Sequence, residues 1–157
     1  MSKARPAERA QAHGETRVAI VRARWNDSIT AALAQGATDA ALAAEAQVER
    51  YEVDGAFELP AAVALLARTG RFEAVVPVGC LVRGETPHFD VLAHAVCTEL
   101  IALSSRERCA ITFGVLTCDS IEQAEARAGG TEGNKGAEAM LAALGLIALR
   151  RQVAAAE

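Results

Sequence analysis

Short apolar runs and longer stretches with helical periodicity alternate along the chain. Residues 74–78 (Ala-Val-Val-Pro-Val) form a run typical of a buried strand, whereas Ile29, Leu33 and Ala37 recur at the three- to four-residue spacing of a helix. Strands are predicted over residues 17–21, 48–53, 74–78 and 110–116. Helices are predicted from about 27 to 46, from 56 to 69, from about 88 to 103 or beyond, from 120 to 128 and from about 134 to 151.

This alternation predicts an α/β fold. Strand and helix follow each other four times, which favours a four-stranded parallel sheet in a three-layer α-β-α sandwich of the flavodoxin-like kind. In such sheets, ligands bind beyond the carboxyl ends of the strands. The polar, alanine-rich residues 1–16 are interpreted as a flexible N-terminal tail, and residues 17–157 as a single domain.

Composition narrows the class of protein. Of 157 residues, 52% are hydrophobic, which is enough for a full core, and the net charge of −4 gives no reason to expect a nucleic-acid partner. The chain has no apolar run of membrane-spanning length and no apolar signal segment at its start, so we expect a cytoplasmic protein without membrane contact. The four cysteines form no C-x-x-C pair, so a structural metal is not expected. Cys97 and Cys109 are interpreted as small buried hydrophobic residues.

The segment after the third predicted strand carries most of the candidate chemistry. It reads Gly-Cys-Leu-Val-Arg-Gly-Glu-Thr-Pro-His-Phe-Asp over residues 79–90. Pro87 suits the first turn of the following helix, and Thr86 suits its N-cap. A helix start of this kind can bind an anion, and His88 on the first turn is placed to transfer protons beside it. On spacing alone, the alternative is an ordinary strand-to-helix turn with solvated charges.

Aromatic residues are predicted to gather at the same edge of the sheet. Trp25 and Phe57 fall just past the first two strands, and Phe113 lies in the fourth. Asn26 or Asp27 is expected to cap the helix that follows. Flat side chains beside titratable groups suit a planar ring that needs stacking and a few polar contacts. The alternative is that these aromatic residues simply pack in the core and at its rim.

The glycine-rich stretch 128–136 resembles a phosphate-binding loop only superficially. Asn134 separates the glycine from Lys135, Gly136 stands where Ser or Thr is needed, and no strand precedes the stretch. Arg127 and Lys135 nevertheless flank a turn at a helix start, where they are either phosphate contacts or solvated cations. The last helix is apolar on more than one face, which favours a homo-oligomer over a monomer with a generously covered core.

Taken together, the motifs resemble those of the lumazine synthase family. The similarity runs from about Val18 to Leu149 and keeps both order and spacing. It is carried by Arg24-Trp25-Asn26, Gly55-Ala56-Phe57-Glu58-Leu59-Pro60, the Arg83–Asp90 block, Phe113-Gly114-Val115-Leu116-Thr117, Ile121-Glu122-Gln123-Ala124 and Gly133-Asn134-Lys135-Gly136.

The resemblance implies a transferase that condenses 5-amino-6-(D-ribitylamino)uracil with 3,4-dihydroxy-2-butanone 4-phosphate. Phosphate and two waters leave, and 6,7-dimethyl-8-ribityllumazine forms in the penultimate step of riboflavin biosynthesis, without metal or cofactor. His88 would transfer the protons. Substrate-binding residues implied by the resemblance or by the motif positions are Trp25, Asn26, Ala56, Phe57, Glu58, Cys80, Leu81, Val82, Glu85, Thr86, Phe113, Arg127 and Lys135.

The resemblance also implies an assembly. Phe113 and Arg127 would reach the site from a neighbouring subunit of a homopentamer, and some members of the family stack pentamers or close them into an icosahedral shell. Three departures from the family pattern stand out: Trp25 replaces a usual Phe, Asp54 replaces a usual Pro and should loosen its turn, and Cys80 replaces a smaller residue. A low-turnover lumazine-binding or shell-forming scaffold of the same fold is the alternative function. A flavodoxin-like electron carrier is disfavoured, because residues 24–27 are too bulky for a phosphate loop.

Overall fold

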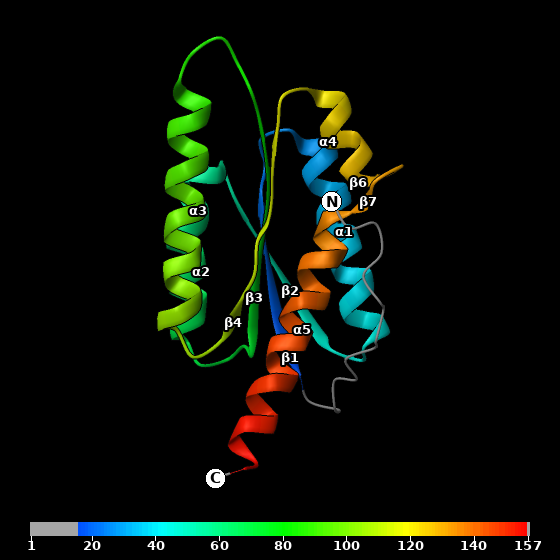
Figure 1. The fold of residues 1–157 in the computed structure, drawn as a ribbon. Helices are drawn as coiled ribbons and strands as arrows, with labels where there is room; N and C mark the ends of the chain where they lie inside the picture. Colours follow the sequence, from blue (N-terminus) through cyan, green and yellow to red (C-terminus); the bar gives the residue numbers. More distant parts are fainter. Residues whose placement is uncertain (1–15, 157) are drawn as a thin grey trace.

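A parallel sheet lies between two layers of helices in the computed structural model, which describes residues 16–156 (Figure 1). Its order is β2-β1-β3, and β3 pairs on its other side with both β4 and β5. All of these pairings are parallel, as predicted. The strands are β1 (Arg17–Ala23), β2 (Gln47–Val53), β3 (Ala74–Val82), β4 (Ala110–Ile111) and β5 (Gly114–Cys118).

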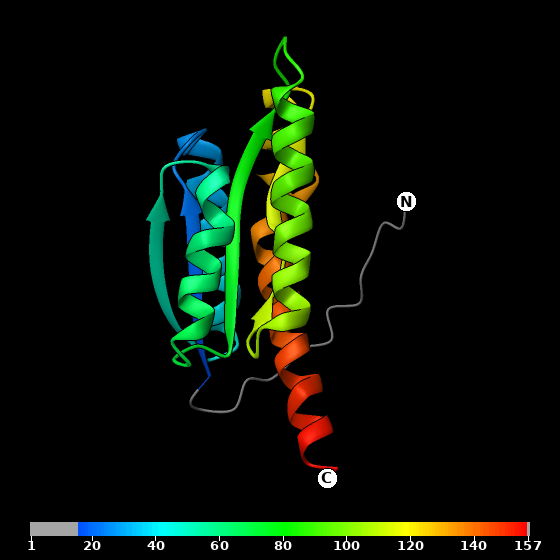
Figure 2. The ribbon, with the colours of Figure 1, turned by 90° about the vertical axis from the view of Figure 1, so that its left-hand side faces the viewer.

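Each face of the sheet has its own helices and its own hydrophobic core. Helices α1, α4 and α5 cover one face, and α2 and α3 cover the other (Figures 1 and 2). Alternate side chains of β1 enter opposite cores, with Val18 and Ile20 on the α1 side and Ala19 and Val21 on the α2 side. The helices are α1 (Asp27–Ala43), the short 3₁₀ helix η1 (Ala56–Glu58), α2 (Leu59–Arg68), α3 (His88–Arg106), α4 (Ile121–Arg127) and α5 (Lys135–Ala154).

The predicted fourth strand is broken into β4 and β5 at residues 112–113. The register with β3 is unchanged across the break, since Val75 pairs with Ile111 and Val78 pairs with Gly114. Pro77 therefore lies opposite Phe113, and proline has no N–H to donate to a ladder. One predicted strand thus becomes two short ones at a single position in the sheet.

The stretch predicted as a glycine-rich turn is a small hairpin. Strands β6 (Ala128–Gly130) and β7 (Gly133–Asn134) pair antiparallel, with an irregularity in register. Gly129 and Gly133 have φ of 109° and 78°, which glycine adopts at little cost.

Helices α1 and α5 make a close backbone contact next to this hairpin. A Cβ built on Gly136 would lie 2.0 Å from the carbonyl oxygen of Leu33. Asn134 caps α5 by accepting from Ala137 N–H at 3.0 Å, and its Nδ2 donates to the Ala32 carbonyl at 2.9 Å. The segment 133–136 therefore fixes α5 against α1.

The predicted end of the N-terminal tail and the predicted burial of one cysteine differ from the structure. Residues 1–15 of the predicted tail, and Glu157, lie outside the described residues, whereas Thr16 is fully buried and accepts a hydrogen bond from Arg151 at 2.8 Å. Cys109 is buried as predicted, but Cys97 is exposed on α3, so the predicted burial of Cys97 is wrong.

Between residues 16 and 156 we find no helix with the length and apolarity needed to cross a bilayer.

Candidate functional site

The carboxyl ends of β1, β2 and β3 meet at one rim of the sheet. Ala23 at the end of β1 pairs with Val53 at the end of β2, and Arg22 pairs with Val78 while β3 continues to Val82. The loop from β1 to α1, the helix η1 and the connection from β3 to α3 therefore all start at this rim (Figure 1). These are the three segments that carry the first group of predicted site residues.

Trp25 and Glu58 approach each other at Gly55. The Glu58 carboxylate accepts a hydrogen bond from the Gly55 backbone N–H at 2.9 Å. A Cβ built on Gly55 would lie 3.3 Å from Trp25 Cδ1 and 3.3 Å from Glu58 Oε2. Gly55 thus leaves just enough room for the indole beside the carboxylate.

Two aromatic side chains at this rim face solvent. Trp25 is 73% exposed and Phe57 is 72% exposed, while Ala56 between these segments is buried. Exposed large aromatic side chains beside a carboxylate can contact a flat, polar ligand. The prediction that these residues serve only as core packing is therefore not supported for Trp25 and Phe57.

Asn26 joins the end of β1 to the end of β3. Its backbone is in the left-handed region, with φ 59° and ψ 53°, and its Nδ2 donates to the Cys80 carbonyl at 2.8 Å. Asn26 occupies the N-cap position of α1, but its side chain makes no capping hydrogen bond, so the predicted capping role is wrong. Asparagine tolerates this backbone conformation better than most residues, which fits its place here.

The β3 end forms a largely apolar wall. Cys80 is buried, and Leu81 and Val82 are half-buried. Burial, and to a smaller extent the nearby Cys118 thiol, raises the pKa of Cys80 to about 11. Because the thiol is then neutral near pH 7, Cys80 offers backbone groups and bulk rather than a nucleophile.

The connection between β3 and α3 projects beyond the sheet and exposes three of the predicted residues (Figures 1 and 2). Glu85, Thr86 and His88 are all exposed. Helix α3 begins at His88 with Pro87 as its N-cap residue and without a side-chain cap, so the predicted N-cap role of Thr86 is wrong. The helix itself starts at His88, as predicted, and the fixed φ of Pro87 (−64°) suits that position.

Sequence reasoning missed the clamp that holds this connection. The Arg83 guanidinium binds Asp90 at 2.9 Å and Asp119 at 2.8 Å, and it lies 4.4 Å from the centre of the Phe89 ring. The ion pair between Arg83 and Asp90 joins the two ends of the segment that carries His88. Opposite charges seven residues apart in the Arg83–Asp90 block were the available signal.

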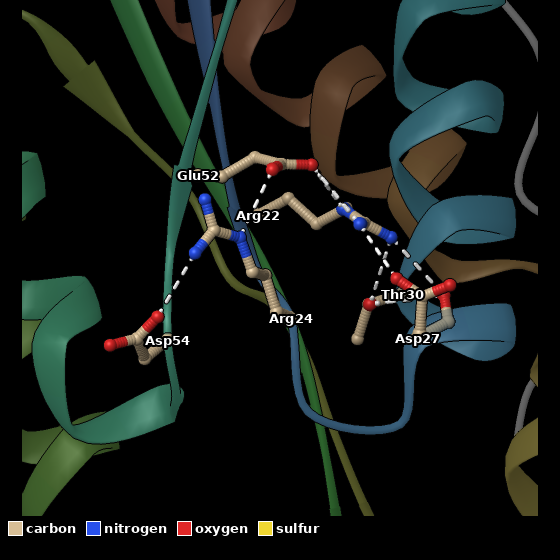
Figure 3. Close-up of polar contacts among 6 residues, drawn as sticks. All are labelled: Arg22, Arg24, Asp27, Thr30, Glu52 and Asp54. Carbon is tan, nitrogen blue, oxygen red and sulfur yellow. Dashed lines mark hydrogen bonds and ion pairs between the residues drawn. The ribbon is translucent and has the colours of Figure 1, made fainter.

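A second missed network lies on the other side of the rim. Arg22 and Arg24 on the β1 side share Glu52 at the end of β2, and Arg24 also binds Asp54 at 3.1 Å (Figure 3). The sequence predicts a looser turn at Asp54, but its carboxylate accepts from Arg24 and its backbone carbonyl accepts from Trp25 N–H at 3.2 Å. The turn is therefore restrained by hydrogen bonds.

Phe113, Arg127 and Lys135 belong to none of the three segments that start at this rim. Phe113 sits at the break before β5, four residues and so about 13 Å before the position that pairs with Leu81. It lines a hollow of about 200 Å³ with residues of α3, including Cys97 and Ile101. Arg127 ends α4, on the face opposite α2 and α3 (Figure 1).

The hairpin β6–β7 places two cations side by side. Arg127 and Lys135 are the residues immediately outside the paired Ala128 and Asn134. Arg127 donates to the Gln123 carbonyl at 3.0 Å, and Lys135 pairs with Glu138 at 2.8 Å. The predicted residues of one chain therefore fall on different elements: Trp25 and His88 at the rim, and Arg127 and Lys135 beside the hairpin.

Comparison with known proteins identifies the relatives of this chain. Residues 15–151 match the sequence model of 6,7-dimethyl-8-ribityllumazine synthase. The proteins of that name from Gemmatimonas aurantiaca and Methylobacterium radiotolerans are 43% and 44% identical over 85% and 86% of this chain, and over 83% and 82% of their own length. The protein of that name from Nautilia profundicola is 40% identical over 91% of this chain and 95% of its own length.

Proposed function

The chain belongs to the 6,7-dimethyl-8-ribityllumazine synthase family, and we propose that it catalyses the family's condensation of 5-amino-6-(D-ribitylamino)uracil with 3,4-dihydroxy-2-butanone 4-phosphate. The observation that carries this proposal is the meeting of the exposed Trp25 indole with the Glu58 carboxylate at Gly55, on the rim where the Arg83–Asp90 segment presents His88.

The rim suits the pyrimidine substrate. Trp25 stacks on the uracil ring, because its indole is exposed and its backbone is fixed by Asp54. Phe57 and Glu58 hold the ring and the ribityl chain, beside Ala56. The backbone groups of Cys80, Leu81 and Val82 contact the ring edge from β3.

The connection to α3 suits the second substrate. Glu85 and Thr86 bind the butanone phosphate beside the start of α3, where free N–H groups favour an anion. The 5-amino group of the pyrimidine attacks the ketone and one water leaves, then phosphate is eliminated, and the ring closes when the ribitylamino nitrogen attacks the remaining carbonyl and the second water leaves. His88 transfers protons in these steps, and holding the two substrates together supplies much of the remaining rate.

The complete site requires a second copy of the chain. Phe113 and Arg127 belong to none of the three segments that start at the rim of their own chain, and we propose that they complete the site of a neighbouring subunit, with Lys135 beside Arg127 at the phosphate. A guanidinium there would stabilise the charge of the leaving phosphate. The exposed Leu141, Leu149 and Val153 on α5 support a homo-oligomer, and we propose pentamers as its unit. The scattered thiols support a cytoplasmic location.

A pair of histidines on α3 gives a matched test of the proton carrier. His88→Ala should slow the condensation by about 10²-fold, because general acid-base catalysis contributes on that order. His94 lies on the same helix and is also exposed, so His94→Ala should leave the rate within about twofold. Equal rates for the two variants would show that water or phosphate moves the proton instead.

A further inference from the structure

Packing alone does not hold the indole of Trp25, which is 73% exposed. The ring belongs to the three-residue loop between β1 and α1, and it is the only tryptophan of the chain. Backbone bonds from this loop to Val53 and Asp54 and the bond from the Asn26 amide to the Cys80 carbonyl restrain its main chain. The charged residues at its two ends add a further set of restraints.

Arg22 closes the loop from within β1. Its guanidinium binds the Asp27 carboxylate at 2.8 Å and the Asp27 carbonyl at 3.2 Å, across the residues that carry the indole (Figure 3). Its Nε also donates to Glu52 at 3.1 Å. The start of α1 is thereby tied to both neighbouring strands.

Arg24 fixes the other side of the loop. Its Nε donates to the second oxygen of Glu52 at 3.1 Å, and its Nη1 donates to Asp54 at 3.1 Å (Figure 3). Its backbone N–H bonds to the carbonyls of Val53 and Asp54. Arg24, the residue before Trp25, thus binds the turn that leads into η1, where Phe57 and Glu58 lie.

We propose that Arg24, acting through Asp54 and Glu52, is a positioning residue that holds the Trp25 indole against Gly55 and Glu58 for the pyrimidine ring. The inference rests on the proposed function for the identity of that ring. All three charged side chains are largely exposed, at 56%, 84% and 46%, and exposed ion pairs contribute little to folding. Their number and their geometry around one loop point instead to a local role.

Asp54 makes this device specific to the chain. A carboxylate at that position matters only if an arginine lies opposite it, and Arg24 does, on the neighbouring strand end. Glu52 accepts from both arginines with separate oxygens, so the alternating charges Asp27, Arg22, Glu52, Arg24 and Asp54 form one continuous chain across the rim.

The fluorescence of Trp25 reports the mobility of its indole directly, since the chain contains no other tryptophan. Arg24→Ala should add a fast component to the fluorescence anisotropy decay of the substrate-free protein. It should also raise the KM for the pyrimidine substrate by about fivefold, which corresponds to the loss of one or two weak pairs, and leave the KM for the butanone phosphate within about twofold. Asp54→Asn should do the same to a smaller extent, because the amide oxygen still accepts.

The matched control is Arg68→Ala. It removes another exposed arginine pair, with Glu107 at 3.0 Å, at the opposite end of the sheet, and should change neither the decay nor either KM. An Arg24→Ala protein with wild-type anisotropy decay and an unchanged pyrimidine KM would overturn the positioning role. Failure of the proposed function would look different, since the wild-type chain would then form no lumazine.

Discussion

Replacing Gly136 with alanine should separate α5 from α1 and destabilise the whole domain. The added Cβ would lie 2.0 Å from the Leu33 carbonyl oxygen and 2.7 Å from its carbonyl carbon. Both are backbone atoms of α1 and cannot rotate away, so the helices must move apart by about 1.4 Å to reach an ordinary contact of 3.4 Å. The same shift stretches the bond from Asn134 Nδ2 to the Ala32 carbonyl, now 2.9 Å.

The expected loss follows from these contacts. Overpacking against a rigid backbone costs about 3 kcal/mol, and a weakened hydrogen bond adds about 1 kcal/mol. Alanine gains up to about 1 kcal/mol of helix propensity over glycine, so the net loss is about 3 kcal/mol. For a chain of this size, that lowers the Tm by roughly 6–12 °C.

Gly145→Ala is the control within the same helix. Nothing in the same chain lies within 4 Å of the Cβ it would add, so within one subunit only the helix propensity changes, and the Tm of the dissociated subunit should rise by about 2–4 °C. Differential scanning calorimetry of both variants measures the contrast. A Gly136→Ala protein that melts at or above the wild-type temperature would contradict the close contact between α1 and α5.

Three further predictions concern the site. Arg83→Ala removes the clamp on the segment that carries His88, so kcat should fall at least about tenfold, and an unchanged kcat would contradict the clamp. Hydrogen bonds from Arg24 and then Arg22 hold the pKa of Glu52 below its usual 4.5, so its restraint on Trp25 should persist above pH 4.5 and be lost as the pH falls through the lower folded value. The anisotropy of Trp25 measured against pH tests this, and Glu52→Gln should remove the transition. Arg127→Ala should raise the KM for the butanone phosphate about tenfold or more and leave pyrimidine affinity nearly intact, whereas equal loss for both would exclude a phosphate-specific role.

The layers of the fold were predictable because hydrophobic periodicity decides them. Apolar runs became β1 and β3, and residues recurring every three or four became the helices. The break in the fourth strand was harder to predict, because it depends on Pro77 lying opposite Phe113, and only the register of two strands reveals that. Cys97 was misassigned for a related reason: it is exposed on α3, and only the packing of that helix on the sheet decides which of its residues are covered.

The location of the candidate residues at one rim of the sheet was predictable, but the contacts that restrain them were not. Motif positions named Trp25, Glu58 and His88, since their residue types suit the chemistry. The sequence did not reveal that Arg83 holds the His88 segment or that Arg24 pairs with Asp54, because such pairs join distant parts of the chain. For the same reason Asn26 was assigned to a cap, whereas its amide reaches Cys80, 54 residues away.

The most direct test of the proposed catalysis is to mix the two substrates with the purified protein and to follow lumazine absorbance together with released phosphate. The account predicts that both rise at equal rates, in proportion to protein concentration. Absorbance that rises no faster than in the protein-free mixture, from a protein that still binds lumazine, would contradict catalysis and favour a binding scaffold of the same fold.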